Sequence, residues 1–106
     1  MTIKEVLQKA RALIADPERW TREALARTSE GWEVRGDNPT ACRWCVVGAI
    51  QAIALGAGVA TWPATVALLP FIPPYAGGVP SWNDDPKTTH ADVLAAFDAA
   101  IARAEE

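Results

Sequence analysis

The sequence is poor in the residue types on which several classes of protein depend. Its 106 residues include only two cysteines, Cys42 and Cys45, which are three positions apart and cannot form a disulfide framework. Lysine and arginine form no basic run, and the formal net charge is −3. Nucleic-acid-binding proteins usually carry a concentrated basic patch, so we expect no nucleic-acid partner.

The N-terminus also lacks the apolar run behind positive charge that marks a secretory signal. We therefore expect a protein of the reducing cytoplasm. Residues 45–62 carry no charge and approach the ~20 residues that cross a bilayer, but glycines interrupt this segment near residues 56–58. Both terminal helices need a core for their apolar faces, so we expect a buried helix in a soluble domain and no membrane partner.

Half of the residues are hydrophobic, which suffices for one modest core in a single domain spanning residues 1–106. We predict a mainly α fold, a small helical bundle around a buried central helix, with a short strand or extended segment near Trp32. Five tryptophans are many for this length, and we expect most of them to pack loops against the central helix. They are Trp20, Trp32, Trp44, Trp62 and Trp82.

The two terminal helices have clear start signals. Thr2 and Glu5 form a capping box before apolar residues at helical spacing. Asp16 and Pro17 end this helix or begin a second one. Thr89 caps the last helix, with the carboxylate of Asp92 in its first turn.

The central helix is predicted over residues 41–55, with Asn38 or Thr40 as its cap. An apolar helix of residues 64–69 is expected to follow, and then a loop over residues 75–80. Small residues recur four positions apart on one side of the central helix and predict a close contact with another backbone. They are Gly48, Ala52 and Gly56.

One candidate site emerges at the head of the central helix. Amides at a helix start stabilise a thiolate, so Cys45 is a candidate nucleophile. The single histidine, His90, faces inward on the last helix, and a loop containing Asn83 and Asp84 precedes it. The predicted catalytic set is therefore Cys45, His90, Asn83 and Asp84.

Two other interpretations of these residues remain open. A buried cysteine is usually a small hydrophobe, and a core-facing histidine usually bonds a backbone carbonyl. A zinc site would instead use Cys42, Cys45, His90 and either Asp84 or Asp85, although a single CxxC pair is a weak signal. We predict no metal and no other cofactor.

Five segments carry a resemblance to a known family. They are residues 14–20 (IADPERW), 43–50 (RWCVVGAI), 82–84 (WND), 89–93 (THADV) and 98–101 (DAAI). The chain resembles a family of small uncharacterised proteins from bacteria and their phages, a domain of unknown function. The resemblance implies that the cysteine matching Cys45 belongs to the family pattern and that Cys42 does not, which disfavours a zinc or redox role for the CxxC pair.

The sequence thus predicts one of two functions. The first is a small non-enzymatic domain that binds another protein, an accessory protein in a phage or mobile-element context. The second is a minimal cysteine-dependent hydrolase or deamidase-like enzyme that uses Cys45 and His90. Hydrogen-bond reach between these two side chains would favour the enzyme, and an exposed apolar patch between Trp62 and Tyr75 would favour the binding domain.

Overall fold

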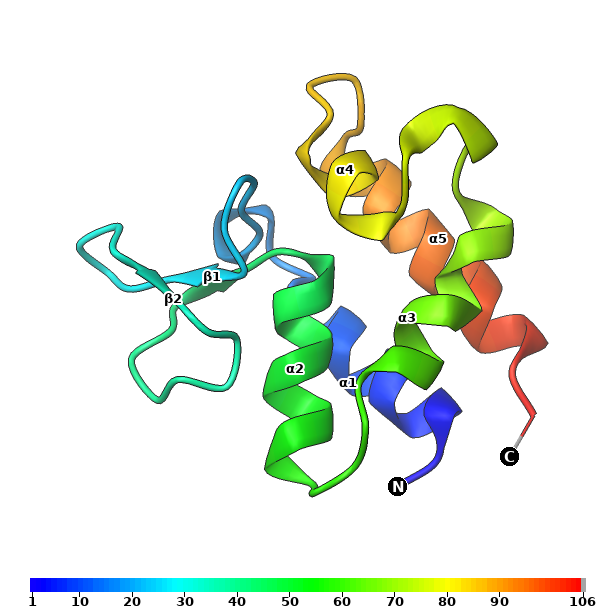
Figure 1. Ribbon diagram of the computed structural model, residues 1–106, viewed down its shortest axis with the longest axis horizontal. Helices are drawn as coiled ribbons and strands as arrows, with labels where there is room; N and C mark the ends of the chain where they lie inside the picture. Colours follow the sequence, from blue (N-terminus) through cyan, green and yellow to red (C-terminus); the bar gives the residue numbers. More distant parts are fainter. Residues whose placement is uncertain (106) are drawn as a thin grey trace.

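A computed structural model describes residues 1–105, apart from the side chain of Tyr75. Figure 1 shows helices gathered on one side and a small sheet with its loops projecting from the other. The mainly α fold class is confirmed, and the short strand near Trp32 is present. The α-helices are α1 (Ile3–Leu13), α2 (Val46–Gly56), α3 (Trp62–Leu68), α4 (Val79–Asp84) and α5 (His90–Arg103), the strands are β1 (Ala26–Arg27), β2 (Glu33–Val34) and β3 (Arg43–Trp44), and the 3-10 turns are η1 (Pro17–Arg19), η2 (Leu69–Phe71) and η3 (Pro74–Ala76).

Local capping explains the starts of both terminal helices. The hydroxyl of Thr2 accepts from the amide of Glu5, and the Glu5 carboxylate accepts from the Thr2 amide at 3.0 Å. Thr89 and Asp92 repeat this reciprocal pair at the start of α5. Each pair satisfies two backbone donors that a helix start would otherwise leave without a partner.

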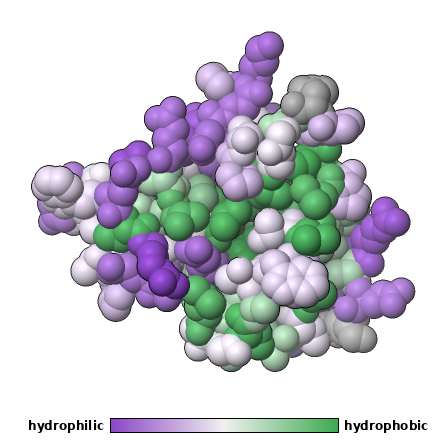
Figure 2. Space-filling model, in the orientation of Figure 1, coloured by the Kyte–Doolittle hydropathy of each residue, from purple (hydrophilic) through white to green (hydrophobic). Residues whose placement is uncertain are grey.

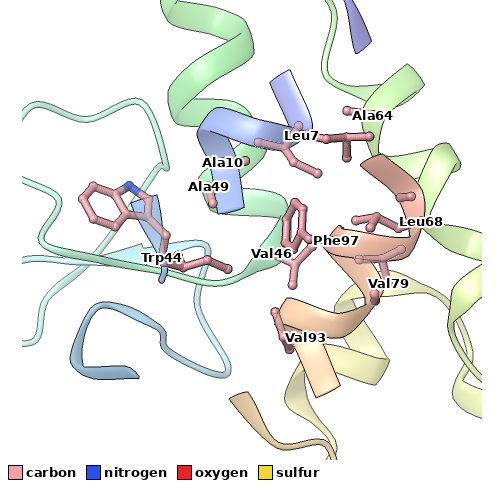
Figure 3. Packing of buried hydrophobic residues seen from close by; sticks show 14 of the residues in the cluster. Leu7, Ala10, Trp44, Val46, Ala49, Ala64, Leu68, Val79, Val93 and Phe97 are labelled. Atoms are coloured by element: carbon pink, nitrogen blue, oxygen red, sulfur yellow. The ribbon is translucent and has the colours of Figure 1, made fainter. Parts of the chain in front are cut away.

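The core lies where α1, α2, α3 and α5 pack against one another. Figure 3 shows Phe97 of α5 pointing into the centre of this cluster, beside Val46 of α2 and near Leu68 of α3. All three side chains are fully buried. Helix α2 buries Val46 and Ile50 completely and packs against α1, α3 and α4, while Leu55 and Gly56 at its C-terminal end are exposed.

The predicted start of the central helix is wrong by five residues. The helix begins at Val46, while Arg43 and Trp44 form strand β3. Strand β1 lies in the middle of the antiparallel sheet, in the order β2-β1-β3, and pairs Ala26 with Trp44. The predicted cap is wrong too, because Asn38 uses its side chain within its own turn, accepting from the amide of Thr40 at 2.9 Å.

The sheet joins α2 through a backbone contact that excludes side chains. A Cβ atom on Gly48 would lie 1.7 Å from the carbonyl oxygen of Leu25, and one on Gly36 would lie 2.0 Å from the carbonyl oxygen of Gly48. The prediction of a close approach is therefore confirmed at Gly48. It is wrong at Gly56, where a Cβ atom would have no neighbour within 4 Å.

Two other local predictions need correction. Residues 17–19 form a single 3-10 turn capped by Asp16, and the residues after Trp20 are extended or bent instead of helical. The expected loop over residues 75–80 contains η3 and the start of α4. Three of the five tryptophans, Trp20, Trp44 and Trp82, pack against the core, as expected of most of them, whereas Trp32 is 72% exposed and Trp62 is 68% exposed.

In residues 1–105 we find no helix that combines the length and the apolar character needed to cross a bilayer.

Candidate functional site

A buried carboxamide, that of Asn83, connects three parts of the fold. Its oxygen accepts the indole N–H of Trp20 at 2.8 Å and the backbone amide of Val46 at 3.0 Å. Its nitrogen donates to the carbonyl of Thr21 and to the carboxylate of Asp84, both at 3.1 Å. An asparagine side chain has two acceptor and two donor positions, so the hydrogen-bonding capacity of Asn83 is fully used.

Asp84 extends this network to a strained backbone position. Its carboxylate oxygen accepts from the amide of Glu23 at 2.8 Å. Glu23 has φ +65°, in the left-handed region that residues other than glycine seldom adopt. The Asp84 carboxylate therefore stabilises a bend that brings residues 20–23 against α4.

Cationic and aromatic side chains surround the indole of Trp20. The ring of His90 lies 5.7 Å from it, centroid to centroid, and the guanidinium of Arg22 lies 4.5 Å from its centroid. Arg22 also donates to the carbonyl of Thr88 just before α5. Trp20, Arg22 and His90 thus join the segment after α1 to the start of α5.

Cys45 is the N-cap of α2, and its thiol is buried, with the residue only 5% exposed. The sulfur accepts from the amide of Gly48 at 3.3 Å, in the way a serine oxygen would cap a helix. Burial raises the pKa of the Cys45 thiol, and the nearby Asp84 carboxylate raises it further against the opposing effect of the Gly48 amide. This environment favours the neutral thiol over the nucleophilic thiolate.

His90 directs its ring elsewhere. Its Nε2 donates to the carbonyl of Ile14 at 2.7 Å, because a carbonyl can only accept. This bond satisfies a backbone acceptor at the C-terminal end of α1. Within the part of the chain that the structure describes, no hydrogen bond joins His90 to Cys45.

The predicted catalytic set therefore falls into two parts, with Cys45, Asn83 and Asp84 in one and His90 in the other. Asn83 and Asp84 reach the head of α2, where Cys45 lies. His90 instead contacts the ring of Trp20, which bonds Asn83. Asn83 and Asp84 belong to helix α4 and not to a loop, and Cys45 precedes α2 instead of lying in its first turn, which corrects both predicted placements.

The four candidate zinc ligands are not assembled. Cys42 is exposed just before β3, and its thiol donates to the carbonyl of Thr40 at 3.5 Å. Among residues 1–105, no three histidine, cysteine or acidic side chains come together in a way that could hold a metal ion.

A second feature of the molecule is the exposed apolar side of α3 and η2, which we call the α3 face. Trp62, Val66 and Leu69 share it at the spacing i, i+4, i+7, and all three are exposed. The face belongs to a run of 40 residues, 44–83, that contains no charged residue. Figure 2 shows hydrophobic residues spread over the middle of the surface that this view presents, with hydrophilic ones toward its edges.

An apolar groove of about 270 Å³ lies next to the α3 face. α3 and η2 form one wall of this α3 groove, and the ends of α1 and α5 form the other. Its apolar lining residues are Ile3, Ala67, Pro70, Phe71, Ala100 and Ala104, and its charged ones are Arg103 and Glu105.

A larger cleft, with a volume of about 690 Å³, lies on the other side of η2, between η3, α4 and the first half of α5. Phe71 and Trp82 contribute aromatic surface to it, while Asp85, Lys87 and Asp92 bring charge of both signs. Asp85 and Asp92 each accept a backbone amide, from Lys87 and Thr89, so both carboxylates already serve local turns.

Comparison with protein families finds one match over almost the whole chain. The model described as "Family of unknown function (DUF6197)" matches residues 1–103. The chain belongs to this family. The resemblance to a domain of unknown function is thereby confirmed. Comparison with curated proteins and with solved structures finds no match.

Sequence reasoning did not find the bond between Trp20 and Asn83 or the exposure of Trp62. The first is invisible because the two residues are 63 positions apart. The sequence gives no signal for the second, because a segment that is apolar on every side normally indicates a buried helix. The α3 face lies between Trp62 and Tyr75, where an exposed apolar patch would favour the binding domain, and the Tyr75 side chain lies outside the described residues.

Proposed function

We propose that this member of the family is a small non-enzymatic protein-binding domain, and that the α3 face is its binding surface. The observation that carries the proposal is the 68% exposure of Trp62 beside exposed Val66 and Leu69. Contiguous apolar surface of this kind marks interaction sites, and tryptophan is enriched among residues that dominate binding energy. The absence of charge along residues 44–83 suits the dry centre of an interface.

The setting is part of the proposal. An accessory role in a phage or another mobile element agrees with the resemblance to small bacterial and phage proteins. Two cysteines without a disulfide suit a reducing cytoplasm. Another protein is the proposed partner, since an acidic chain with net charge −3 has little to attract nucleic acid.

Two tryptophans of similar exposure allow a matched test. Trp62 lies on the α3 face and is 68% exposed, whereas Trp32 lies beside β2 and is 72% exposed. Tagged wild-type protein, Trp62→Arg and Trp32→Arg would be used to capture partners from a lysate of the encoding organism. We expect a protein that wild type and Trp32→Arg retain and that Trp62→Arg loses. Equal capture by all three would refute the α3 face as the binding surface.

The alternative proposal is a cysteine-dependent hydrolase or deamidase-like enzyme that uses Cys45 and His90, with Asn83 and Asp84. What supports it is the position of Cys45 at a helix start, where the Gly48 amide points at the sulfur. The burial of the thiol, its raised pKa and the bond between His90 and the Ile14 carbonyl give it less support than the binding proposal has.

A further inference from the structure

We infer that the partner of the α3 face is a second copy of this chain, in a two-fold dimer in which Trp62 of each copy enters the α3 groove of the other. This inference rests on the proposed function, because it uses the same face for protein binding. Three observations carry it: the size of the groove, the position of the groove next to Trp62, and the distribution of charge.

The α3 groove has the size and lining for one large apolar side chain. Its volume of about 270 Å³ is just below the roughly 300–1,000 Å³ that small-molecule pockets enclose. Alanines at positions 67, 100 and 104 leave this space open, and Phe71 offers an aromatic wall. The exposed indole of Trp62 is the largest apolar side chain that the neighbouring surface presents.

Trp62 and the groove lie on adjacent sides of one short element. Trp62 and Val66 are on the exposed side of α3, while Ala67 and Pro70 line the groove. A two-fold contact requires that one surface patch be complementary to itself, so it must carry both a projecting part and the hollow that receives it. The α3 face and the α3 groove together meet this requirement.

The charge distribution favours self-association at this surface. The chain is acidic, so two copies that meet through charged surfaces bring like charges together. Residues 44–83, which include the whole α3 face, contain no charged residue, so contact through this face brings no like charges together. The two charged residues of the groove, Arg103 and Glu105, have opposite signs and can pair across a two-fold axis.

The test changes Trp62 and the α3 groove in separate variants. Trp62→Ser removes the projecting side chain, and Ala67→Trp fills the groove; Trp32→Ser is the matched control. Sedimentation equilibrium and native mass spectrometry of the full chain would measure dimerisation, and the melting temperature would confirm folding. Trp62 is exposed, so Trp62→Ser folds even if Ala67→Trp does not.

We expect wild type and Trp32→Ser to dimerise equally. Loss of one contact between Trp62 and the groove should weaken the dimer at least about 30-fold, the factor that corresponds to a 2 kcal/mol hot spot. A dimer of two Trp62→Ser chains, or of two Ala67→Trp chains, loses both contacts and should be about 1,000-fold weaker. A mixture of Trp62→Ser and Ala67→Trp should form a heterodimer about 30-fold tighter than either variant alone, because one contact stays intact in it.

Three results would overturn the inference: a monomer up to millimolar concentration, a dimer that Trp62→Ser leaves unchanged, or the absence of heterodimer in the mixture. If Ala67→Trp does not fold, the comparison of Trp62→Ser with Trp32→Ser decides alone. A monomeric wild type that still captures another protein through Trp62 would refute only the second copy as partner. Capture that does not depend on Trp62, together with a monomeric protein, would refute the proposed function as well.

Discussion

The indole N–H of Trp20 donates to the carboxamide oxygen of Asn83 at 2.8 Å, across 63 positions of sequence. The same oxygen accepts the first amide of α2, so one side chain fixes the segment after α1, the start of α2 and the end of α4. Asn83 is completely buried. Because all its hydrogen bonds are made within the protein, we assign it a structural role and expect its loss to be costly.

Replacing Asn83 by alanine leaves the indole of Trp20 and the amide of Val46 without their acceptor. Each buried polar group without a partner costs about 1–3 kcal/mol, so we expect Asn83→Ala to lower the free energy of unfolding by about 2–6 kcal/mol. Urea unfolding followed by far-UV circular dichroism measures this loss. Asn38→Ala is the control, since Asn38 is exposed and serves only its own turn; similar losses in both variants would contradict the assignment.

Gly48 and Gly56 allow a second matched comparison within α2. A methyl group on Gly48 meets the Leu25 carbonyl at 1.7 Å, whereas a methyl group on Gly56 meets open space. We expect Gly48→Ala to cost at least about 3 kcal/mol through displacement of the sheet. Gly56→Ala should leave the melting temperature unchanged or raise it, because alanine is favoured over glycine in helices by about 1 kcal/mol. Equal melting temperatures for the two variants would argue against the close contact.

The two cysteines should differ in their reaction with an alkylating reagent. Cys42 is exposed, while Cys45 is buried with a raised thiol pKa. In native protein at pH 8 we expect modification of Cys42 within minutes and protection of Cys45 until urea unfolds the chain. Mass spectrometry of Cys42→Ser and Cys45→Ser follows each thiol alone. Rapid modification of Cys45 in folded Cys42→Ser would instead support the cysteine-dependent enzyme.

The raised pKa of Cys45 also predicts a dependence of stability on pH. The unfolded chain releases the thiol proton near its ordinary pKa of about 8.5, whereas the folded protein holds it to higher pH. The stability contributed by the neutral thiol is therefore complete below that ordinary value and declines as pH rises above it, by at most about 1.4 kcal/mol per pH unit.

Comparing wild type with Cys45→Ala isolates this effect from other groups that titrate at high pH. We expect the difference in free energy of unfolding between the two proteins to be constant from pH 6 to pH 8 and to shift in favour of the variant toward pH 10. Urea titrations at each pH measure it. A difference that stays constant up to pH 10 would show that the folded and unfolded chains hold the Cys45 proton equally.

Features encoded within a few residues were predictable from the sequence. The capping boxes at Thr2 and Thr89 involve side chains three positions apart, and both starts are confirmed. The start of α2 was not predictable in this way. Residues 41–44 look like the first turn of an apolar helix, but pairing of Trp44 with Ala26 extends them, and that pairing joins residues 18 positions apart.

The same distinction between local features and distant contacts applies to the candidate site. Position along the chain placed Cys45 at a helix start, and Cys45 is the N-cap of α2. The sequence does not reveal that the Trp20 ring lies against His90, or that His90 bonds the carbonyl of Ile14, 76 positions away. Those contacts depend on how α1 and α5 pack, which only the assembled core determines.

The concentration of every charged residue in positions 1–43 and 84–106 has a consequence for handling the protein. Solubility depends on repulsion between like-charged molecules, and the stretch between those positions contributes nothing to it. Near the isoelectric point, about pH 5.1, the remaining charges cancel and the uncharged surface meets no opposition to clustering. We therefore expect precipitation in mildly acidic buffers, and a stable solution several pH units higher.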